Sequence, residues 1–142
     1  MKRLLLDAAN QSGCTIVSDG WSNVQRRPLI NIMVICPHGE CFIKAIDSSG
    51  EIKYGAYIAS IISEVIDEIE EKNVLQVVMD NAANCRAAGR ILEHHYPRLY
   101  ASGCNTHSLN LVLQDWYKSN NTEWFKTIID KARRVVKFIL KQ

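Results

Sequence analysis

Residues 15–23 read TIVSDGWSN and residues 74–84 read VLQVVMDNAAN, and these two stretches decide the expected fold. Each begins as an apolar run rich in β-branched residues, which favours a strand, and each run leads directly to an aspartate, Asp19 or Asp80. If the two strands are parallel neighbours, they lie about 4.8 Å apart and their carboxyl ends share one edge of a sheet. We therefore expect the two carboxylates to lie close together.

The hydrophobic pattern of the whole chain predicts an alternation of strands and helices. A period of two predicts strands at residues 15–18, 29–36, 41–47, 74–79 and 99–102. A period of 3.6 predicts helices at residues 54–71, 83–95, 106–117 and 122–140. The turn Pro37-His38-Gly39 joins the second and third strands, which predicts that these two form an antiparallel hairpin.

The order of these elements predicts an α/β fold with a mixed sheet of about five strands and flanking helices. The strand at residues 29–36 is apolar on both faces, so we expect helices to cover the sheet on both sides. Three strands in a meander, followed by right-handed α/β crossovers, are the arrangement of a ribonuclease H-like fold. In that fold the fourth strand lies parallel to the first, as its neighbour, which would bring Asp19 and Asp80 to the same edge.

Composition limits the class of protein. The chain of 142 residues has the length of one domain, and its 47% hydrophobic and 23% charged residues are typical of a soluble globular protein. The apolar runs are too short for a membrane span, so no membrane partner is expected, and the first residues do not resemble an export signal. A nuclear or cytosolic location is the expectation. The five cysteines have no paired spacing and are expected to be free buried thiols.

The two aspartates allow two interpretations. Carboxylate oxygens suit Mg²⁺, which needs only one or two protein carboxylates besides water and substrate phosphate, and paired divalent ions assist phosphodiester chemistry. No basic residue is adjacent in sequence to Asp19 or Asp80. The alternative is structural: Asp80 caps the helix that begins near Ala82, and Asp19 shapes a turn before Gly20. Spacing alone leaves both interpretations open.

Four motifs in a fixed order carry a family resemblance: SDGWSN, RPLINIMV, NVLQVVMDNAANCRAAG and CNTHSLNLVLQD. Together they resemble the transposase-derived domain of the hAT superfamily, which is widespread in plants and often found beside BED-type zinc fingers. The resemblance covers residues 13–115. It implies a ribonuclease H-like core for DNA cleavage and strand transfer, with Asp19 as the first catalytic acid and Asp80 as the second. The implied cofactor is Mg²⁺ or Mn²⁺.

The same resemblance implies nuclear localisation and transposon-end DNA as the partner. The broad apolar face of the helix expected at residues 122–140 predicts a homo-oligomer as a further association. The third acid of the family, a glutamate, lies downstream of a large helical insertion. We expect residues 13–117 to form the core and residues 122–142 to begin that insertion, all within one domain. The chain ends at Gln142, so it is expected to be inactive by itself. The alternative is a non-catalytic, domesticated module for DNA binding or protein interaction.

Further candidates have weaker patterns. Trp21, Arg26 and Arg27 are candidate DNA contacts, although a tryptophan at this place also serves as a core plug and the arginines as surface residues. Cys104 and His107 match the CxxH motif of the family, either as packing residues or as half of a zinc site. Cys85, His94 and His95 are the residues that could complete such a site. Ser108 stands where the family often has another cysteine, which weakens the zinc interpretation.

Overall fold

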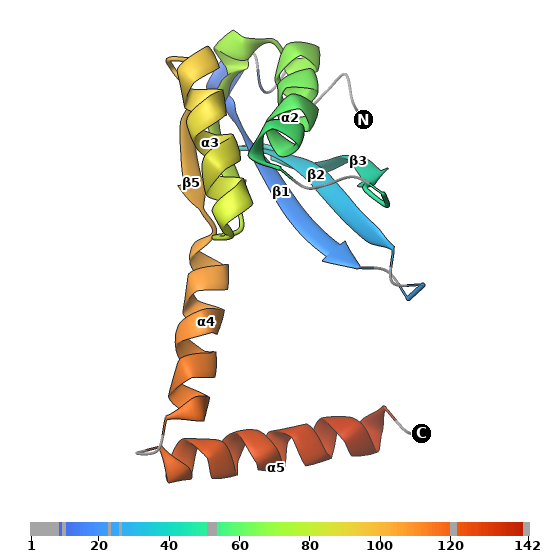
Figure 1. The fold of residues 1–142 in the computed structure, drawn as a ribbon, viewed down its shortest axis with the longest axis vertical. Coiled ribbons are helices and arrows are strands. Elements are labelled where there is room, and N and C mark those ends of the chain that lie inside the picture. Colours follow the sequence, from blue (N-terminus) through green and yellow to red (C-terminus); the bar gives the residue numbers. More distant parts are fainter. Residues whose placement is uncertain are drawn as a thin grey trace. The chain divides into compact units, whose positions relative to one another are not determined.

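The structure, a computed structural model, divides the chain into two compact units, Met1–Cys104 and Asn105–Gln142. It describes residues 9, 11–22, 24–25, 27–50, 54–119 and 122–140, without the side chains of residues 21 and 22. The first unit contains the sheet and the second contains two helices (Figure 1). None of the helices in the described ranges is both long enough and apolar enough to cross a membrane.

The first unit is built on a five-stranded mixed sheet in the order β3-β2-β1-β4-β5. Its strands are β1 (Cys14–Ser22), β2 (Pro28–Cys36), β3 (Gly39–Asp47), β4 (Val74–Met79) and β5 (Tyr100–Gly103). β1, β2 and β3 pair in antiparallel fashion, whereas β4 pairs in parallel with both β1 and β5. The predictions of a five-stranded mixed sheet and of a fourth strand parallel to the first are confirmed.

β1 is longer than its sequence pattern predicts. It continues through Asp19 and Gly20 to Ser22, because the antiparallel ladder with β2 continues there and pairs Asp19 with Asn31 and Gly20 with Ile30. The interpretation of Asp19 as a turn residue is therefore wrong. β4 ends at Met79, so the second half of β1 extends beyond its parallel neighbour.

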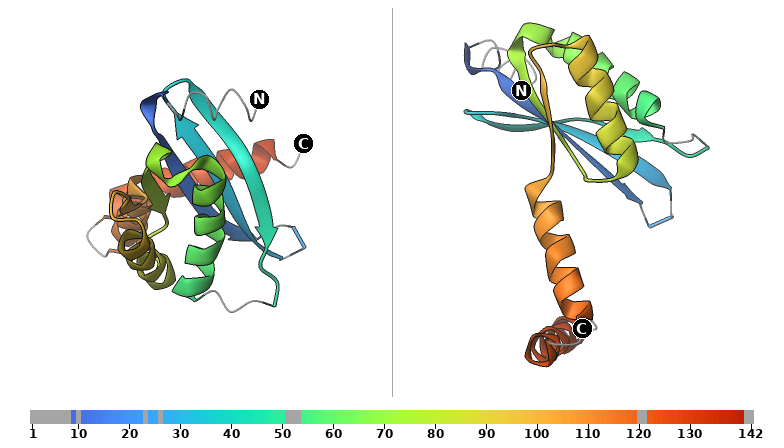
Figure 2. Two further views of the ribbon diagram at one scale, coloured as in Figure 1. Left: turned by 90° about the horizontal axis from the view of Figure 1, so that it is seen from above. Right: turned by 60° about the vertical axis from the view of Figure 1, so that its left-hand side comes forward.

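Two helices of the first unit, α2 (Gly55–Ile69) and α3 (Ala83–His95), lie on the same face of the sheet (Figure 2). Alternate residues of β2 point into the core beneath these helices, and Ile32 and Val34 are fully buried there. On the opposite face, Met33 is half-buried and Ile35 is exposed. Among the described residues of this unit, helices cover one face of the sheet, which differs from the prediction that they cover both.

The helical pattern continues for two residues beyond the point where α2 ends. Glu70 has a positive φ of 76°, which stops the helix at Ile69 and leads into the short 3₁₀ turn η1 (Glu71–Asn73). The buried Asn73 side chain donates a hydrogen bond of 3.0 Å to the Ile69 carbonyl. The turn therefore satisfies an acceptor at the end of the helix and directs the chain into β4.

The second unit consists of α4 (Asn105–Lys118) and α5 (Glu123–Ile139). The bounds of both helices are within one residue of the predicted ranges. Polar contacts join the two helices: the Tyr117 hydroxyl donates to Asp130 at 3.0 Å, and the Arg133 guanidinium lies 4.8 Å from the centre of the Tyr117 ring. The predicted core range of residues 13–117 thus includes α4, which belongs to the second unit by its contacts.

Candidate functional site

The register between β1 and β4 sets the position of the two aspartates. The parallel ladder pairs Thr15 with Gln76 and Val17 with Val78. Continued by two residues, the same register places Asp19 opposite Asp80, the residue that directly follows β4. The last pair of this ladder is Val17 with Val78, so Asp19 and Asp80 each lie two residues beyond it, at the same end of two neighbouring parallel strands.

Asp80 also has a structural task. Its Oδ1 atom accepts a hydrogen bond of 2.7 Å from the backbone N–H of Ala82, the residue that precedes α3. This bond stabilises the turn between β4 and α3 and fixes one carboxylate oxygen of Asp80. The structural interpretation of Asp80 is therefore correct in part. One oxygen holds the turn, and the carboxylate keeps further acceptor positions.

Asp19 has a different environment. It is exposed, and alternation along β1 places it on the face opposite to Ser18 and Gly20. Ser18 and Gly20 line a cavity of about 130 Å³ together with Asp80, whereas Asp19 lies outside this cavity. The described part of the chain contains no cluster of three or more histidine, cysteine, aspartate or glutamate side chains that could hold a metal ion. At this edge of the sheet the described residues therefore offer two acids.

A second cavity, of about 260 Å³, borders the same turn and lies between α3 and β5. Asp80 and Asn81 line one end of this cavity, which we call the α3–β5 groove. Arg86 and Arg90 on α3 line it as well, and both side chains are exposed. Sequence reasoning missed these two arginines, although their spacing of four residues, just after Asp80, predicts that they share one face of α3.

Asn81 and Gly103 lock the turn after Asp80 to the end of β5. The Asn81 side chain occupies the place where a Cβ atom on Gly103 would stand. It donates a hydrogen bond of 3.4 Å to the Cys104 carbonyl, and the Cys104 N–H donates to the Met79 carbonyl at 2.7 Å. Because Gly103 has no side chain, the ends of β4 and β5 and the turn that carries Asp80 fit closely together.

The structure does not gather the candidate zinc ligands into one group. Cys104 is the last residue of the first unit, whereas His107 lies in the first turn of α4 in the second. Cys85 is half-buried beside the Asp80 turn and lines both cavities. His94 and His95 are exposed at the end of α3. Within the described ranges these residues form no group of metal ligands.

The candidate DNA contacts lie at the far end of β1 and in the loop after it. Trp21 pairs with Leu29 in the β1–β2 ladder, but its side chain lies outside the described residues, as does all of Arg26. Arg27 is described and exposed. The parallel ladder between β1 and β4 ends at Val17, so Trp21 is four residues further along β1. Their role in DNA contact stays a prediction.

The comparisons with known proteins give one positive result. No curated protein matches the chain. The family model described as Domain of unknown function (DUF659) matches residues 3–135, which is nearly the whole chain. Because this match spans more than half of the chain, the chain belongs to the DUF659 family.

Proposed function

We propose that this chain is part of the ribonuclease H-like catalytic core of a hAT-like, transposase-derived protein. The DUF659 family is found in hAT-like transposase-derived proteins of plants, which supports the transposase-related part of the proposal. The strand order with β4 parallel to β1 supports the ribonuclease H-like part. In the full-length protein the core acts on DNA at transposon ends, in the nucleus.

One observation carries the proposal: β4 pairs in parallel with β1, and Asp19 and Asp80 each follow the last pair of that ladder by two residues. Two carboxylates can share a divalent cation when both side chains can turn toward the same ion. Asp19 stays in an exposed position, and none of the ion pairs in the described ranges involves Asp19 or Asp80. The proposed cation site requires the exposed Asp19 side chain to turn toward Asp80, since only Asp80 lines the cavity at this end of the strands.

The residues present fit Mg²⁺ or Mn²⁺ better than Zn²⁺. Both side chains offer hard carboxylate oxygens, and Mg²⁺ is held by one or two carboxylates with water and phosphate in its other positions. Structural zinc sites use four cysteine and histidine ligands and catalytic sites three protein ligands, and the described residues contain no group of three or more such side chains. Asp19 and Asp80 would hold the metal, and a pair of divalent ions there would supply activation of an attacking hydroxyl and stabilisation of the leaving oxygen of a phosphodiester.

The two aspartates then have separate roles in the chain. Asp80 is fixed by its bond to the Ala82 N–H, so its second oxygen is held in a constant direction. Asp19 is held only through its backbone ladder with β2, and its exposed side chain can turn to meet an ion. Asp80 therefore sets the position of the ion, and Asp19 supplies the second carboxylate ligand.

Paramagnetic broadening by Mn²⁺ tests this proposal. Mn²⁺ is titrated into the labelled chain, and the NMR amide signals of residues 18–20 and 79–82 are expected to broaden first. Asp19→Asn and Asp80→Asn should each remove most of this effect, because each takes away one of two charged ligands. Asp115→Asn, which changes an exposed acid on α4, serves as the matched control and should broaden like the natural chain. Equal broadening in all four proteins would contradict the proposal.

A second candidate function is a non-catalytic module for protein association. The observation that favours it is the apolar face of α5, where Trp124 is 61% exposed and Ile139 is 63% exposed. If this face mediates self-association, the solution mass should rise with concentration, and Trp124→Ala should restore a monomer. Sedimentation of the natural chain as a monomer at every concentration would exclude self-association through this face.

A further inference from the structure

We propose that the α3–β5 groove binds the phosphate backbone of DNA through Arg86 and Arg90 and leads one strand toward Asp80. The inference rests on the proposed function, because it names how the DNA reaches the acids, and it gives a role to residues that no sequence motif assigned. The groove combines a pair of cations with the turn that carries an acid of the candidate site.

Arg86 is already held in place beside that turn. Its Nη1 atom donates a hydrogen bond of 2.7 Å to the Asn81 carbonyl, one residue after Asp80. An arginine has five N–H donors in a planar fork, so this single bond fixes the guanidinium and leaves donors for a phosphate. The entropy cost of ordering the side chain on binding is therefore reduced.

Arg90 continues the same line along α3. It lies one helical turn beyond Arg86, about 6 Å along the axis, and lines the same groove. Two guanidinium groups at this separation can contact different phosphates of one strand. The line runs from Arg90 through Arg86 to the Asp80 turn, so a bound strand would be directed to the acids.

Two acids, Asp80 and Glu93, line the α3–β5 groove together with Arg86 and Arg90. None of the ion pairs in the described ranges includes Arg86 or Arg90. The nearest acid that lines the groove besides Asp80 is Glu93, and its Oε1 atom accepts a hydrogen bond of 3.0 Å from the Ala101 N–H on β5. Glu93 thus has a structural task at the sheet edge, and the two guanidinium groups, which are in no described ion pair, can donate to an external anion.

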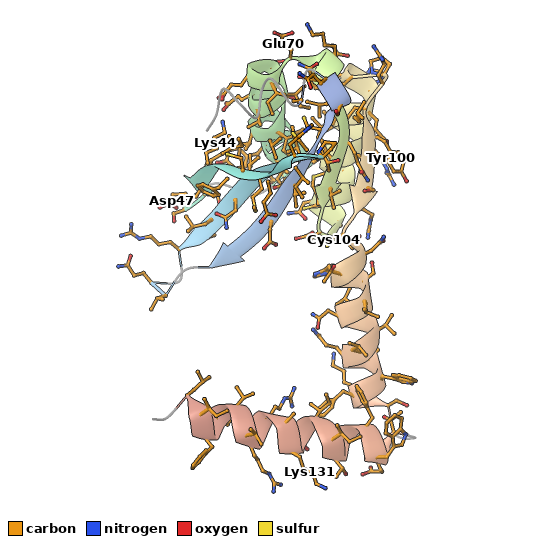
Figure 3. All side chains as sticks on the ribbon, turned by 180° about the vertical axis from the view of Figure 1, so that it is seen from behind. Lys44, Asp47, Glu70, Tyr100, Cys104 and Lys131 are labelled. Carbon is orange, nitrogen blue, oxygen red and sulfur yellow. The ribbon has the colours of Figure 1, made fainter. Side chains whose placement is uncertain are left out.

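The β5 residues that line the other side of the groove have small side chains, which leave room for the sugar-phosphate backbone of DNA. Ala101, Ser102 and Gly103 of β5 line the groove, and Figure 3 marks the two ends of this segment by Tyr100 and Cys104. On α3, Gly89 directly precedes Arg90 and lines the groove; it packs so closely on Ala101 that a Cβ atom on Gly89 would approach the Ala101 methyl group to 3.0 Å. Small residues therefore line the groove between α3 and β5, and the longer Arg86 and Arg90 side chains border it.

Fluorescence anisotropy with a short labelled DNA duplex, in EDTA, tests the groove. Arg86→Gln and Arg90→Gln are each expected to weaken binding about five-fold, and the double variant more than ten-fold, since each loses a charged contact to phosphate. The slope of log K against log salt between about 50 and 200 mM should fall by about one for each arginine removed. Arg86→Lys keeps the charge without the fork and should give an intermediate loss.

Arg98→Gln is the matched control. Arg98 is exposed, lies in the loop before β5 and does not line the groove. Its replacement removes the same charge and should change the affinity less than two-fold. An equal loss in Arg98→Gln, an unchanged affinity and salt slope in the double variant, or no binding by the natural chain at low salt would each overturn the proposal.

The two proposals fail separately. The DNA-binding measurement contains EDTA, so its result does not depend on a metal at Asp19 and Asp80. If Mn²⁺ broadening is absent but the arginine variants lose DNA affinity, the groove stands and the metal site is wrong. If Mn²⁺ binds as expected but the arginine variants bind DNA normally, the metal site stands and the groove is wrong.

Discussion

Replacement of Gly103 by alanine tests the close fit between β5 and the Asp80 turn. The new Cβ atom would stand on the Asn81 side chain, so Asn81 must leave its place and give up its bond of 3.4 Å to the Cys104 carbonyl. Overpacking of this kind costs about 1–3 kcal/mol. Alanine gains about 0.4–1 kcal/mol by restricting the unfolded chain. We expect a net loss of about 1–2 kcal/mol in the free energy of unfolding.

Urea unfolding followed by circular dichroism measures this loss, and the chain offers a matched control. Gly20→Ala makes the same change in another strand, where the nearest atom to the new Cβ is the Leu29 carbonyl oxygen at 4.0 Å. Neither glycine has a positive φ, so alanine is allowed by the backbone at both positions. Gly20→Ala should therefore be neutral or slightly stabilising.

A double-mutant cycle identifies the cause. In the Asn81→Ala background the space is empty, so adding Gly103→Ala should cost less than about 0.5 kcal/mol, and the two changes should be strongly non-additive. If Gly103→Ala is as stable as the natural chain, or if its cost is the same with and without the Asn81 side chain, the proposed fit at this turn is wrong.

Two further predictions concern the core. Gly55→Ala should destabilise the protein by about 1–3 kcal/mol in the same urea assay, although alanine favours helices, because its Cβ would approach the Cβ of Ala87 to 2.7 Å where α2 meets α3; an equal or higher unfolding midpoint would contradict this packing. Burial of Cys14, with smaller effects from the neighbouring Cys36, raises the pKa of the Cys14 thiol from 9.0 to about 11. The unfolded chain therefore loses the Cys14 proton at a lower pH than the folded chain does. The stability that the protonated Cys14 thiol contributes is complete below pH 9 and falls as the pH rises to about 11, by roughly 2–3 kcal/mol at about 1.4 kcal/mol per pKa unit. Comparison of urea midpoints across this range should show that Cys14→Ala lacks this decline, and parallel curves would refute it.

The sequence predicts the strands and helices well where the hydrophobic period is strong. β4 and α3 have the predicted bounds, because each contains an uninterrupted pattern bounded by polar or turn residues. The extension of β1 was not predictable from its own residues. Asp19 and Gly20 disfavour a strand locally, and only their pairing with β2 keeps them extended. The apolar character of β2 on both faces also predicts more helical cover than the described part of the first unit has.

The candidate site was predictable only in its outline. The position of Asp19 and Asp80 follows from strand order and register, which the alternation of elements indicates. Three features depend on how side chains pack between elements that are distant in sequence: the double role of Asp80, the close packing of Asn81 against Gly103, and the α3–β5 groove. The spacing of Arg86 and Arg90 places them on one face of α3, but no local pattern shows that this face borders β5.

The most direct test of the account is a crystal structure of the chain soaked in Mn²⁺, with anomalous data. The account predicts a peak bound by carboxylate oxygens of both Asp19 and Asp80, at about the 2.0–2.3 Å expected for hard divalent cations. It also predicts that the Asp80 bond to the Ala82 N–H is kept. A peak on one aspartate alone, or carboxylates turned to opposite faces of the sheet with no shared ion, would contradict the central claim.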